Sequence, residues 1–131
     1  MLTLSKQSDY GLIIISQLKG KNDFVPLSEL ISNTNLPQRF LARIAALLVN
    51  NKLLISREGR VGGYKLAPGV QKISVYEYLK IFEKQISFLS CIHSKTRCRY
   101  EKVCKHKHGV HTKLNQIVLQ QMKNVKLMEL F

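Results

Sequence analysis

Residues 26–50 place a short helical stretch, a tight turn and a longer amphipathic stretch in succession, and this order restricts the fold more than any other feature. Helical spacing of leucine and isoleucine predicts the first helix of the pair at 27–33. Turn-forming Asn-Thr-Asn follows at 33–35. Pro37 then stands at or near the start of a helix that ends at about Asn50, because proline is tolerated in the first helical turn. The succession predicts a helix-turn-helix.

Helical periodicity also covers three other segments, at 8–19, 74–82 and about 110–126. The stripe expected to be buried in the helix after Pro37 comprises Phe40, Leu41, Ile44, Leu47 and Leu48. The last helix carries an apolar stripe of Val110, Leu114, Ile117, Val118, Met122 and Val125. Because little of the chain remains to cover this last stripe, it predicts a contact between two subunits.

A glycine-rich turn between two short strands follows the helix-turn-helix. The strands are expected at 53–57 and 64–67, with the turn at 58–63. A β-hairpin in this position is a wing. The expected fold is therefore mainly α with a small β-hairpin: a winged helix-turn-helix domain followed by a long C-terminal dimerisation helix.

The chain is strongly basic, with 21 Lys and Arg against 8 Asp and Glu and a formal net charge of +13. A polyanion is its natural partner, because each phosphate that it neutralises releases condensed counterions. Charge alone does not distinguish DNA from RNA or an anionic membrane. The sequence has no apolar run of membrane-spanning length, and its N-terminus lacks the apolar core of a secretion signal. We therefore expect a cytoplasmic protein without a membrane partner.

The outward face of the helix after Pro37 suits contact with double-stranded DNA. Gln38, Arg39 and Arg43 lie on that face, in the half of the helix that enters the major groove in helix-turn-helix proteins. Arginine can bond guanine bidentately, and glutamine can bond adenine. A solvated basic face is the alternative interpretation, and the adjacent wing favours DNA.

The wing adds a second set of basic and glycine residues. The contacts predicted here come from Arg57, Arg60, Gly62, Gly63 and Lys65. Arg60 lies at the hairpin tip and is the candidate for the minor groove. The glycines allow close approach to a phosphate backbone, and they are also needed for the turn itself. A dinucleotide-binding loop is rejected because the glycine spacing differs and no helix follows directly.

Three cysteines, Cys91, Cys98 and Cys104, lie within fourteen residues, and the rest of the chain has none. An odd number without a secretion signal disfavours a disulfide framework. Six and five residues separate consecutive cysteines, whereas structural zinc sites usually place the cysteines of a pair about two to four apart. The wider spacing fits a loop around an iron–sulfur cluster of the [2Fe–2S] or [4Fe–4S] type.

Basic and imidazole side chains surround these thiols. The lysines and arginines between Lys95 and Lys107 favour the thiolate form that binds metal, and they offset the negative charge of a thiolate-ligated cluster. Three cysteines leave a fourth ligand position open, and His106 and His108 follow Cys104 closely. A thiol redox switch or a zinc site is the alternative use of the same cysteines.

These features, in this order, resemble the winged-helix iron–sulfur transcription regulators of bacteria, which include repressors of cluster assembly and nitric-oxide-sensing repressors. The motifs that carry the resemblance across nearly the whole chain are Leu4–Lys6, Ser8–Leu12, Val25–Leu27, Leu36–Pro37, Phe40–Leu41 and, most specific, Gly59–Leu66 in the wing. The resemblance implies a homodimer, a palindromic operator and a cluster whose state changes DNA affinity. It assigns cluster ligation to Cys91, Cys98 and Cys104.

Two comparisons with this family leave the fourth ligand open. Its cluster-assembly repressors have a histidine three residues after the third cysteine, where this sequence has Lys107 between His106 and His108. Its nitric-oxide sensors can use an N-terminal aspartate of the other subunit, and Asp9 stands in the matching position. The same aspartate has an alternative role as a cap of the first helix.

The chain accordingly divides into a winged helix-turn-helix DNA-binding domain at 1–83, a cysteine-rich cluster-binding loop at 84–108, and a dimerisation helix with its tail at 109–131. The expected function is a homodimeric regulator whose operator affinity is controlled by a cluster that senses iron, redox state or nitric oxide. No nucleophile–base set in the sequence indicates an enzyme. The alternatives are a regulator of the same fold with a thiol or zinc sensor, and a basic RNA-binding zinc protein.

Overall fold

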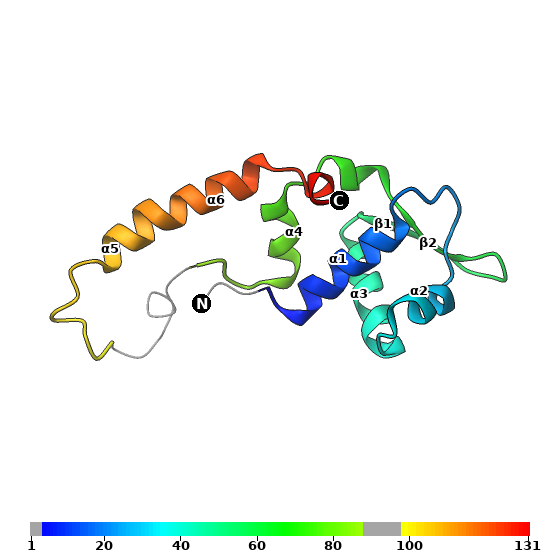
Figure 1. Ribbon diagram of the computed structural model, residues 1–131, viewed down its shortest axis with the longest axis horizontal. Coiled ribbons are helices and arrows are strands. Elements are labelled where there is room, and N and C mark those ends of the chain that lie inside the picture. Colours follow the sequence, from blue (N-terminus) through cyan, green and yellow to red (C-terminus); the bar gives the residue numbers. More distant parts are fainter. Residues whose placement is uncertain (1–3, 88–97) are drawn as a thin grey trace.

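The helix-turn-helix and the hairpin form one end of an elongated molecule, and the C-terminal helix extends from there toward the other end (Figure 1). The computed structural model describes residues 4–87 and 98–131. The elements in chain order are α1 (Lys6–Leu18), α2 (Leu27–Thr34), α3 (Gln38–Asn50), β1 (Leu54–Arg57), β2 (Gly63–Leu66), the 3₁₀ turn η1 (Pro68–Gln71), α4 (Val75–Phe82), α5 (Lys107–Gly109), the π-helical turn η3 (Val110–Leu114), α6 (Asn115–Asn124) and the 3₁₀ turn η4 (Leu127–Leu130). The predicted mainly helical fold with an antiparallel hairpin is confirmed. Across the described ranges, none of the helices combines the length and the apolar character needed to cross a membrane.

Helices α1 and α3 pack against each other in the core of the winged domain. The hydroxyl oxygen of Ser5 accepts a hydrogen bond from the Ser8 amide at 3.3 Å and thereby caps α1. Pro37 precedes α3, as the sequence predicts. Residues from both helices are fully buried at the centre: Ile14, Ile15, Leu18, Leu41, Ile44, Ala45 and Leu48. Burial of this apolar surface fixes α3 on the domain and leaves its opposite side to solvent.

The aromatic ring of Phe40 departs from the buried stripe predicted for α3. This side chain is 47% exposed and makes an edge contact with Tyr10, with 6.5 Å between the ring centroids. The buried stripe of α3 starts with Leu41 instead. The prediction that Phe40 is buried is therefore wrong, because its position lies at the border of the stripe, where the helix surface turns toward solvent.

The wing is the antiparallel pair of β1 and β2, and it is also tied to the chain that precedes α2. The pairing ends with Arg57 opposite Gly63. Val25 and Tyr64 exchange two backbone hydrogen bonds of 2.8 Å, which form a single-residue bridge beside the hairpin. Gly63 has a φ of 140°, and a side chain there would collide with the Val25 carbonyl. Glycine is therefore required where the two segments approach each other.

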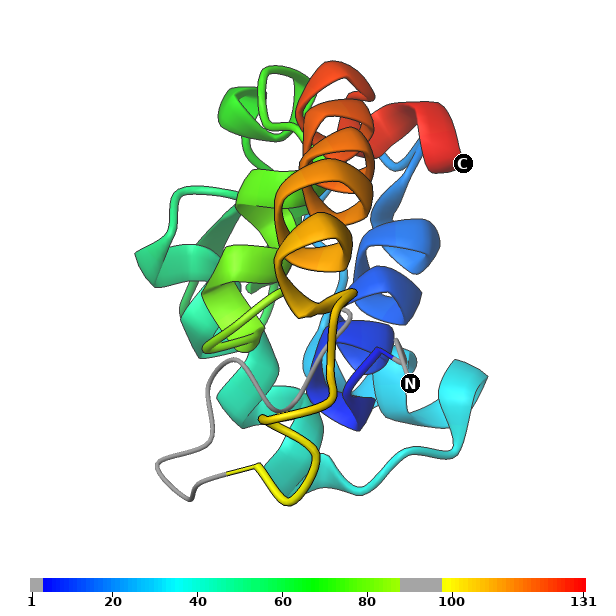
Figure 2. The ribbon, with the colours of Figure 1, turned by 90° about the vertical axis from the view of Figure 1, so that its left-hand side faces the viewer.

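The segment after α6 returns to the winged domain, a contact that the sequence analysis did not predict. The Val75 amide donates to the Val125 carbonyl, and the Leu127 amide donates to the Ile73 carbonyl, each at 3.0 Å. The Leu127 side chain is fully buried and belongs to the same core as α1 and α3. In Figure 2, α6 stands in front of α4, which it contacts. The tail therefore completes the winged domain and fixes the end of α6 on it.

The apolar residues of the last helix divide between two sides. Val118, Met122 and Val125 are half-buried, and Met122 packs against the core. Leu114 and Ile117 are 52% and 59% exposed. The expected apolar stripe is thus wider than one side of the helix. Within the described chain, α6 packs through the side that faces α4.

Candidate nucleic-acid interface and metal site

Three side chains that the sequence assigns to DNA lie together on the exposed side of α3. Gln38, Arg39 and Arg43 are all exposed, and they occupy the N-terminal half of the helix. Between and after them, Ala42 is half-buried and Ala46 is exposed. Small alanine side chains leave room for a close approach, while the longer ones carry hydrogen-bonding groups. This surface therefore has the shape and the donors needed to enter a major groove.

The wing presents its basic residues in different ways. Arg60 is exposed at the tip, and Lys65 is half-buried on β2. The guanidinium carbon of Arg57 lies 4.1 Å from the centroid of the Phe24 ring. Its Nη2 atom also donates a hydrogen bond of 2.9 Å to the Val61 carbonyl. Arg57 thus has partners within the protein itself, which the sequence analysis did not predict.

The two adjacent glycines of the wing have a packing role. Gly62 is buried, and a side chain there would collide with the Arg57 carbonyl. Gly63 faces the Val25 carbonyl in the same way. The close packing of the hairpin therefore explains why both positions are glycine. Contact of these glycines with a phosphate backbone stays a prediction.

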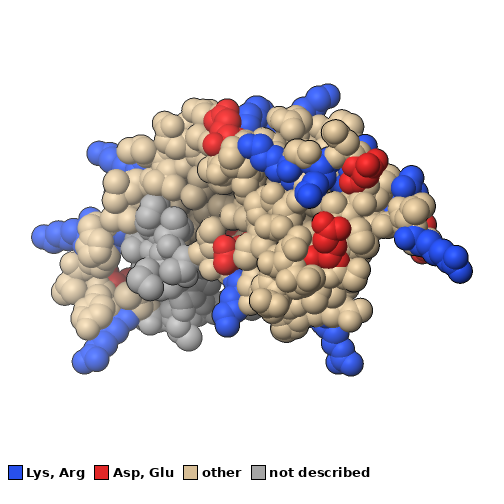
Figure 3. Space-filling view, turned by 45° about the vertical axis from the view of Figure 1, so that its right-hand side comes forward, with Lys and Arg blue, Asp and Glu red and all other residues tan. Residues whose placement is uncertain are grey.

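Basic side chains project from both ends of the visible face of the molecule (Figure 3). Acidic side chains are fewer on that face, in keeping with 8 Asp and Glu against 21 Lys and Arg in the chain. A surface of this kind attracts a polyanion over a longer range than any single contact.

The described part of the cysteine segment, defined as residues 84–108, contains two of the three predicted thiol ligands. Cys98 and Cys104 are free and half-buried. The Nδ1 atom of His106 lies 3.8 Å from the Cys104 Sγ atom. His108 has an exposed side chain, and Cys91 lies outside the described residues. Within the described ranges, no three His, Cys, Asp or Glu residues form a group that could hold a metal ion.

Glu83 joins the end of α4, and hence the start of the cysteine segment, to the beginning of α1. Its Oε1 atom accepts hydrogen bonds from the Ser5 amide at 3.0 Å and from the Ser8 hydroxyl at 3.1 Å. Partial burial alone would raise the pKa of the Glu83 carboxyl, but the hydrogen bonds from Ser5 and Ser8 outweigh it and hold this pKa below its ordinary value. Asp9 lies exposed in the first turn of α1, where Ser5 provides the cap.

The fold has counterparts among known proteins. Residues 4–131 match the Rrf2 family, described as iron-dependent transcriptional regulators. The chain belongs to the Rrf2 family. Membership confirms the resemblance to winged-helix regulators and makes the chain a DNA-binding transcription regulator, not an enzyme. It does not support the alternative of an RNA-binding zinc protein.

Individual relatives of this Rrf2-family chain are distant in sequence. The HTH-type transcriptional regulator NsrR of Oceanobacillus iheyensis is 26% identical over 116 residues, covering 86% of this chain and 79% of its own. The solved structure of CymR, the global cysteine regulator of B. subtilis, is 23% identical with a TM-score of 0.73, covering 99% of this chain and 96% of its own. IscR of T. potens is 20% identical with a TM-score of 0.65, covering 98% and 85%. These two structures confirm the fold.

Two residues at the site of this Rrf2-family chain were not found by sequence reasoning. Phe24 precedes the motif Val25-Pro26 and has the sequence context of an ordinary core aromatic. Glu83 follows the amphipathic stretch of α4 and has the context of a solvated carboxylate. Neither position carries a local signal of its partner, because each partner is distant in the sequence.

Replacing Glu83 with glutamine tests the link between α1 and α4. Because its pKa is lowered in the folded state, this carboxylate stabilises the protein above the unfolded-state pKa of about 4.3, and the contribution is lost as the pH falls through the folded-state value. We expect Glu83→Gln to be less stable than the wild type at neutral pH and to approach it in acid. Urea unfolding at about pH 7 and about pH 3 measures both free energies, with Glu58→Gln in the wing as a control. The same difference at both pH values would contradict the prediction.

Proposed function

We propose that this regulator acts in the cytoplasm as a homodimer on a palindromic operator, and that an iron–sulfur cluster in its cysteine segment controls the affinity. One observation carries the proposal: α3 presents Gln38, Arg39 and Arg43 beside a wing with Arg60 exposed at its tip. A winged helix with these two surfaces can contact the major groove and the adjacent minor groove together. The description of the family as iron-dependent supports the regulatory part.

The exposed side chains have different roles in the proposed complex. Arg39 and Arg43 suit the acceptor edge of guanine, and Gln38 suits adenine. Arg60 suits a narrow minor groove, where the negative potential is enhanced. Lys65 suits the phosphate backbone, a contact that adds affinity without sequence preference.

Substituting Arg39 and Lys65 separately distinguishes base contact from phosphate contact. Arg39→Ala is expected to lose about 1–3 kcal/mol of discrimination at one base pair, because a bidentate guanine contact is removed. Lys65→Ala is expected to weaken binding to all sequences alike and to lower the slope of log affinity against log salt by about 1. Selection of duplexes from a random pool, followed by fluorescence anisotropy titrations, measures both effects. Equal losses on every duplex from both variants would refute the assignment of α3.

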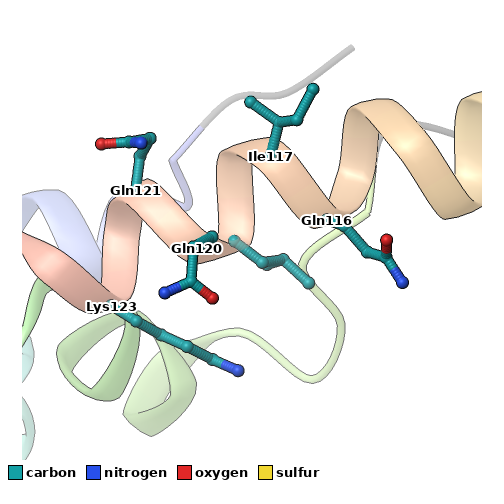
Figure 4. Close-up of a pocket in the computed structure, with 6 residues that line it drawn as sticks. Gln116, Ile117, Gln120, Gln121 and Lys123 are labelled. Atoms are coloured by element: carbon teal, nitrogen blue, oxygen red, sulfur yellow. The ribbon is translucent and has the colours of Figure 1, made fainter.

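An exposed face of α6 supports the homodimer. A shallow groove on this face is lined by Gln116, Ile117, Leu119, Gln120, Gln121 and Lys123. Figure 4 shows Ile117 and Gln121 on one side of the helix and Gln120 and Lys123 on the other. A second copy of α6 would bury Ile117, which is more than half exposed in the single chain. Two-fold pairing of this kind matches the two half-sites of a palindrome, about one helical turn apart.

A charge at Ile117 tests the α6 interface. Ile117→Glu is expected to convert the dimer to a monomer, because two carboxylates would be buried against an apolar face of the partner. The fold should persist, since the side chain is 59% exposed within one chain. Sedimentation equilibrium measures the mass. Val61→Glu, at a 77% exposed position of the wing outside the groove, serves as the matched control. An Ile117→Glu protein that stays dimeric would exclude this interface.

The donor types in the cysteine segment fit an iron–sulfur cluster. The proposed ligands are Cys91, Cys98 and Cys104, with a fourth from His106, His108 or Asp9 of the partner subunit. His106 is favoured over His108 by its 3.8 Å approach to the Cys104 thiol. When bound, such a cluster supplies iron whose loss, oxidation or nitrosylation changes the charge and ligation of the segment.

The residues that flank the cysteine segment connect it to the rest of the chain. Glu83, directly before the segment, accepts hydrogen bonds from Ser5 and Ser8 at the start of α1. At its other end, α5 and η3 continue into α6, which packs on α4. A change in the shape of the segment therefore acts on α1, which packs on α3, and on α6, which carries the proposed dimer face. We propose this route for the control of operator affinity.

Visible absorption of protein purified without oxygen tests the cluster. We expect broad visible bands, with iron and acid-labile sulfide in the same sample, and their loss in Cys98→Ala. His106→Ala is expected to weaken retention of the cluster more than its matched control His108→Ala. A colourless protein free of iron after reconstitution would contradict the cluster. That result would leave DNA binding intact and favour the second candidate, a thiol or zinc sensor that uses the free thiols of Cys98 and Cys104.

A further inference from the structure

The Arg57 side chain lies between the body of the winged domain and the tip of the wing. Its guanidinium stacks on the Phe24 ring at 4.1 Å from the centroid. The same group donates to the Val61 carbonyl at 2.9 Å. One side chain thus contacts a residue before α2 on one side and a residue of the hairpin tip on the other.

The Phe24 ring is a fixed platform for this contact. Its neighbour Val25 is buried and exchanges two backbone hydrogen bonds with Tyr64 on β2. Gly63, next in the same strand, allows the close approach of Val25 because it has no side chain. Phe24 is therefore held at the root of the wing, within reach of the Arg57 guanidinium.

The hairpin tip extends beyond this platform. Val61 is 77% exposed, and the Gly62 amide donates to the Gly59 carbonyl at 3.1 Å to close the turn. Arg60 is exposed in the middle of this turn. A bond from Arg57 to the Val61 carbonyl consequently restrains the residue adjacent to Arg60, and with it the direction in which Arg60 projects.

We propose that Arg57 is a positioning residue of the wing: its planar guanidinium, stacked on Phe24 and bonded to the Val61 carbonyl, holds Arg60 in place for the minor groove. Arg57 then affects affinity through Arg60, and not through a phosphate contact of its own. This role rests on the proposed DNA binding by the wing. A lysine would keep the charge but lose the flat surface and the fork of donors, so it would not replace arginine here.

DNA affinity measured in the wild-type protein and in an Arg60→Ala background tests the proposal. The probe is a duplex selected by the wild-type protein from a random pool, titrated by fluorescence anisotropy at several salt concentrations. Phe24→Leu, Arg57→Lys and Arg57→Gln are each expected to weaken binding by about three- to tenfold. In an Arg60→Ala background the same three changes are expected to have almost no further effect, because the side chain that they position is absent. Phe131→Leu, an aromatic-to-leucine change at a half-buried residue outside α3, the wing and α6, is the matched control and should bind like the wild type.

The charge-neutral variant Phe24→Leu separates positioning from direct phosphate contact. If Arg57 only neutralised a phosphate, Phe24→Leu and Arg57→Lys would bind like the wild type. Arg57→Gln would then lower the salt slope by about 1 in both backgrounds. That pattern would overturn the proposal.

A second measurement does not require DNA. Order parameters from ¹⁵N relaxation report the fast motion of the Arg60, Val61 and Gly62 amides in the free protein. They are expected to fall in Phe24→Leu and Arg57→Gln, and unchanged values would overturn the proposal. A wild-type protein that binds no duplex would refute the proposed function instead, while the order parameters would still decide whether Arg57 holds the tip.

Discussion

The hydroxyl of Tyr78 donates a 2.6 Å hydrogen bond to the Ser8 carbonyl inside an apolar core, and the packing of α1 on α4 depends on it. Burial raises the pKa of this phenol, with a further contribution from the charge of Asp9, so the group stays a neutral donor. Gly11 makes the contact sterically possible, because a side chain there would collide with the Tyr78 hydroxyl. Since α4 also contacts α6, this bond holds the helix of the winged domain on which the C-terminal helix packs.

The surface suited to DNA and the described cysteines lie toward opposite ends of the molecule (Figure 1). Their requirements differ: α3 and the wing keep charged side chains in solvent, whereas Cys98 and Cys104 are partly shielded from it. Packed helices and their hydrogen bonds are one route by which one end can influence the other. The described chain offers two connections of this kind, the Glu83 bonds to α1 and the packing of α6 on α4.

Local pattern was enough to predict α1 to α4, the hairpin and α6, because hydrophobic period, prolines and glycines act within a few residues of one another. The exposed face of α3 followed from the same pattern, since Leu41 and Ile44 define the buried side and thereby the opposite one. The partners of Arg57 and Glu83 could not be predicted in this way. Phe24 and Ser5 are brought to them by the tertiary fold, and the sequence spacing of each pair contains no period that would signal the contact. Phe40 shows why burial at the border of an apolar stripe is difficult to predict. Whether such a residue is buried depends on how closely the neighbouring helix packs against it.

The return of the tail to the winged domain closes a long loop. Lys126 donates to the Lys72 carbonyl across 54 positions of sequence, next to the backbone bonds that join Ile73 and Val75 to the tail. The whole cysteine segment lies inside this loop. Closing a flexible loop costs conformational entropy that grows with its length, so any bond or ligand that joins residues within the segment shortens the path and lowers that cost. The burial of Leu127 in the core is consequently coupled to the chemistry of the cysteines through the entropy of the chain between Ile73 and Leu127.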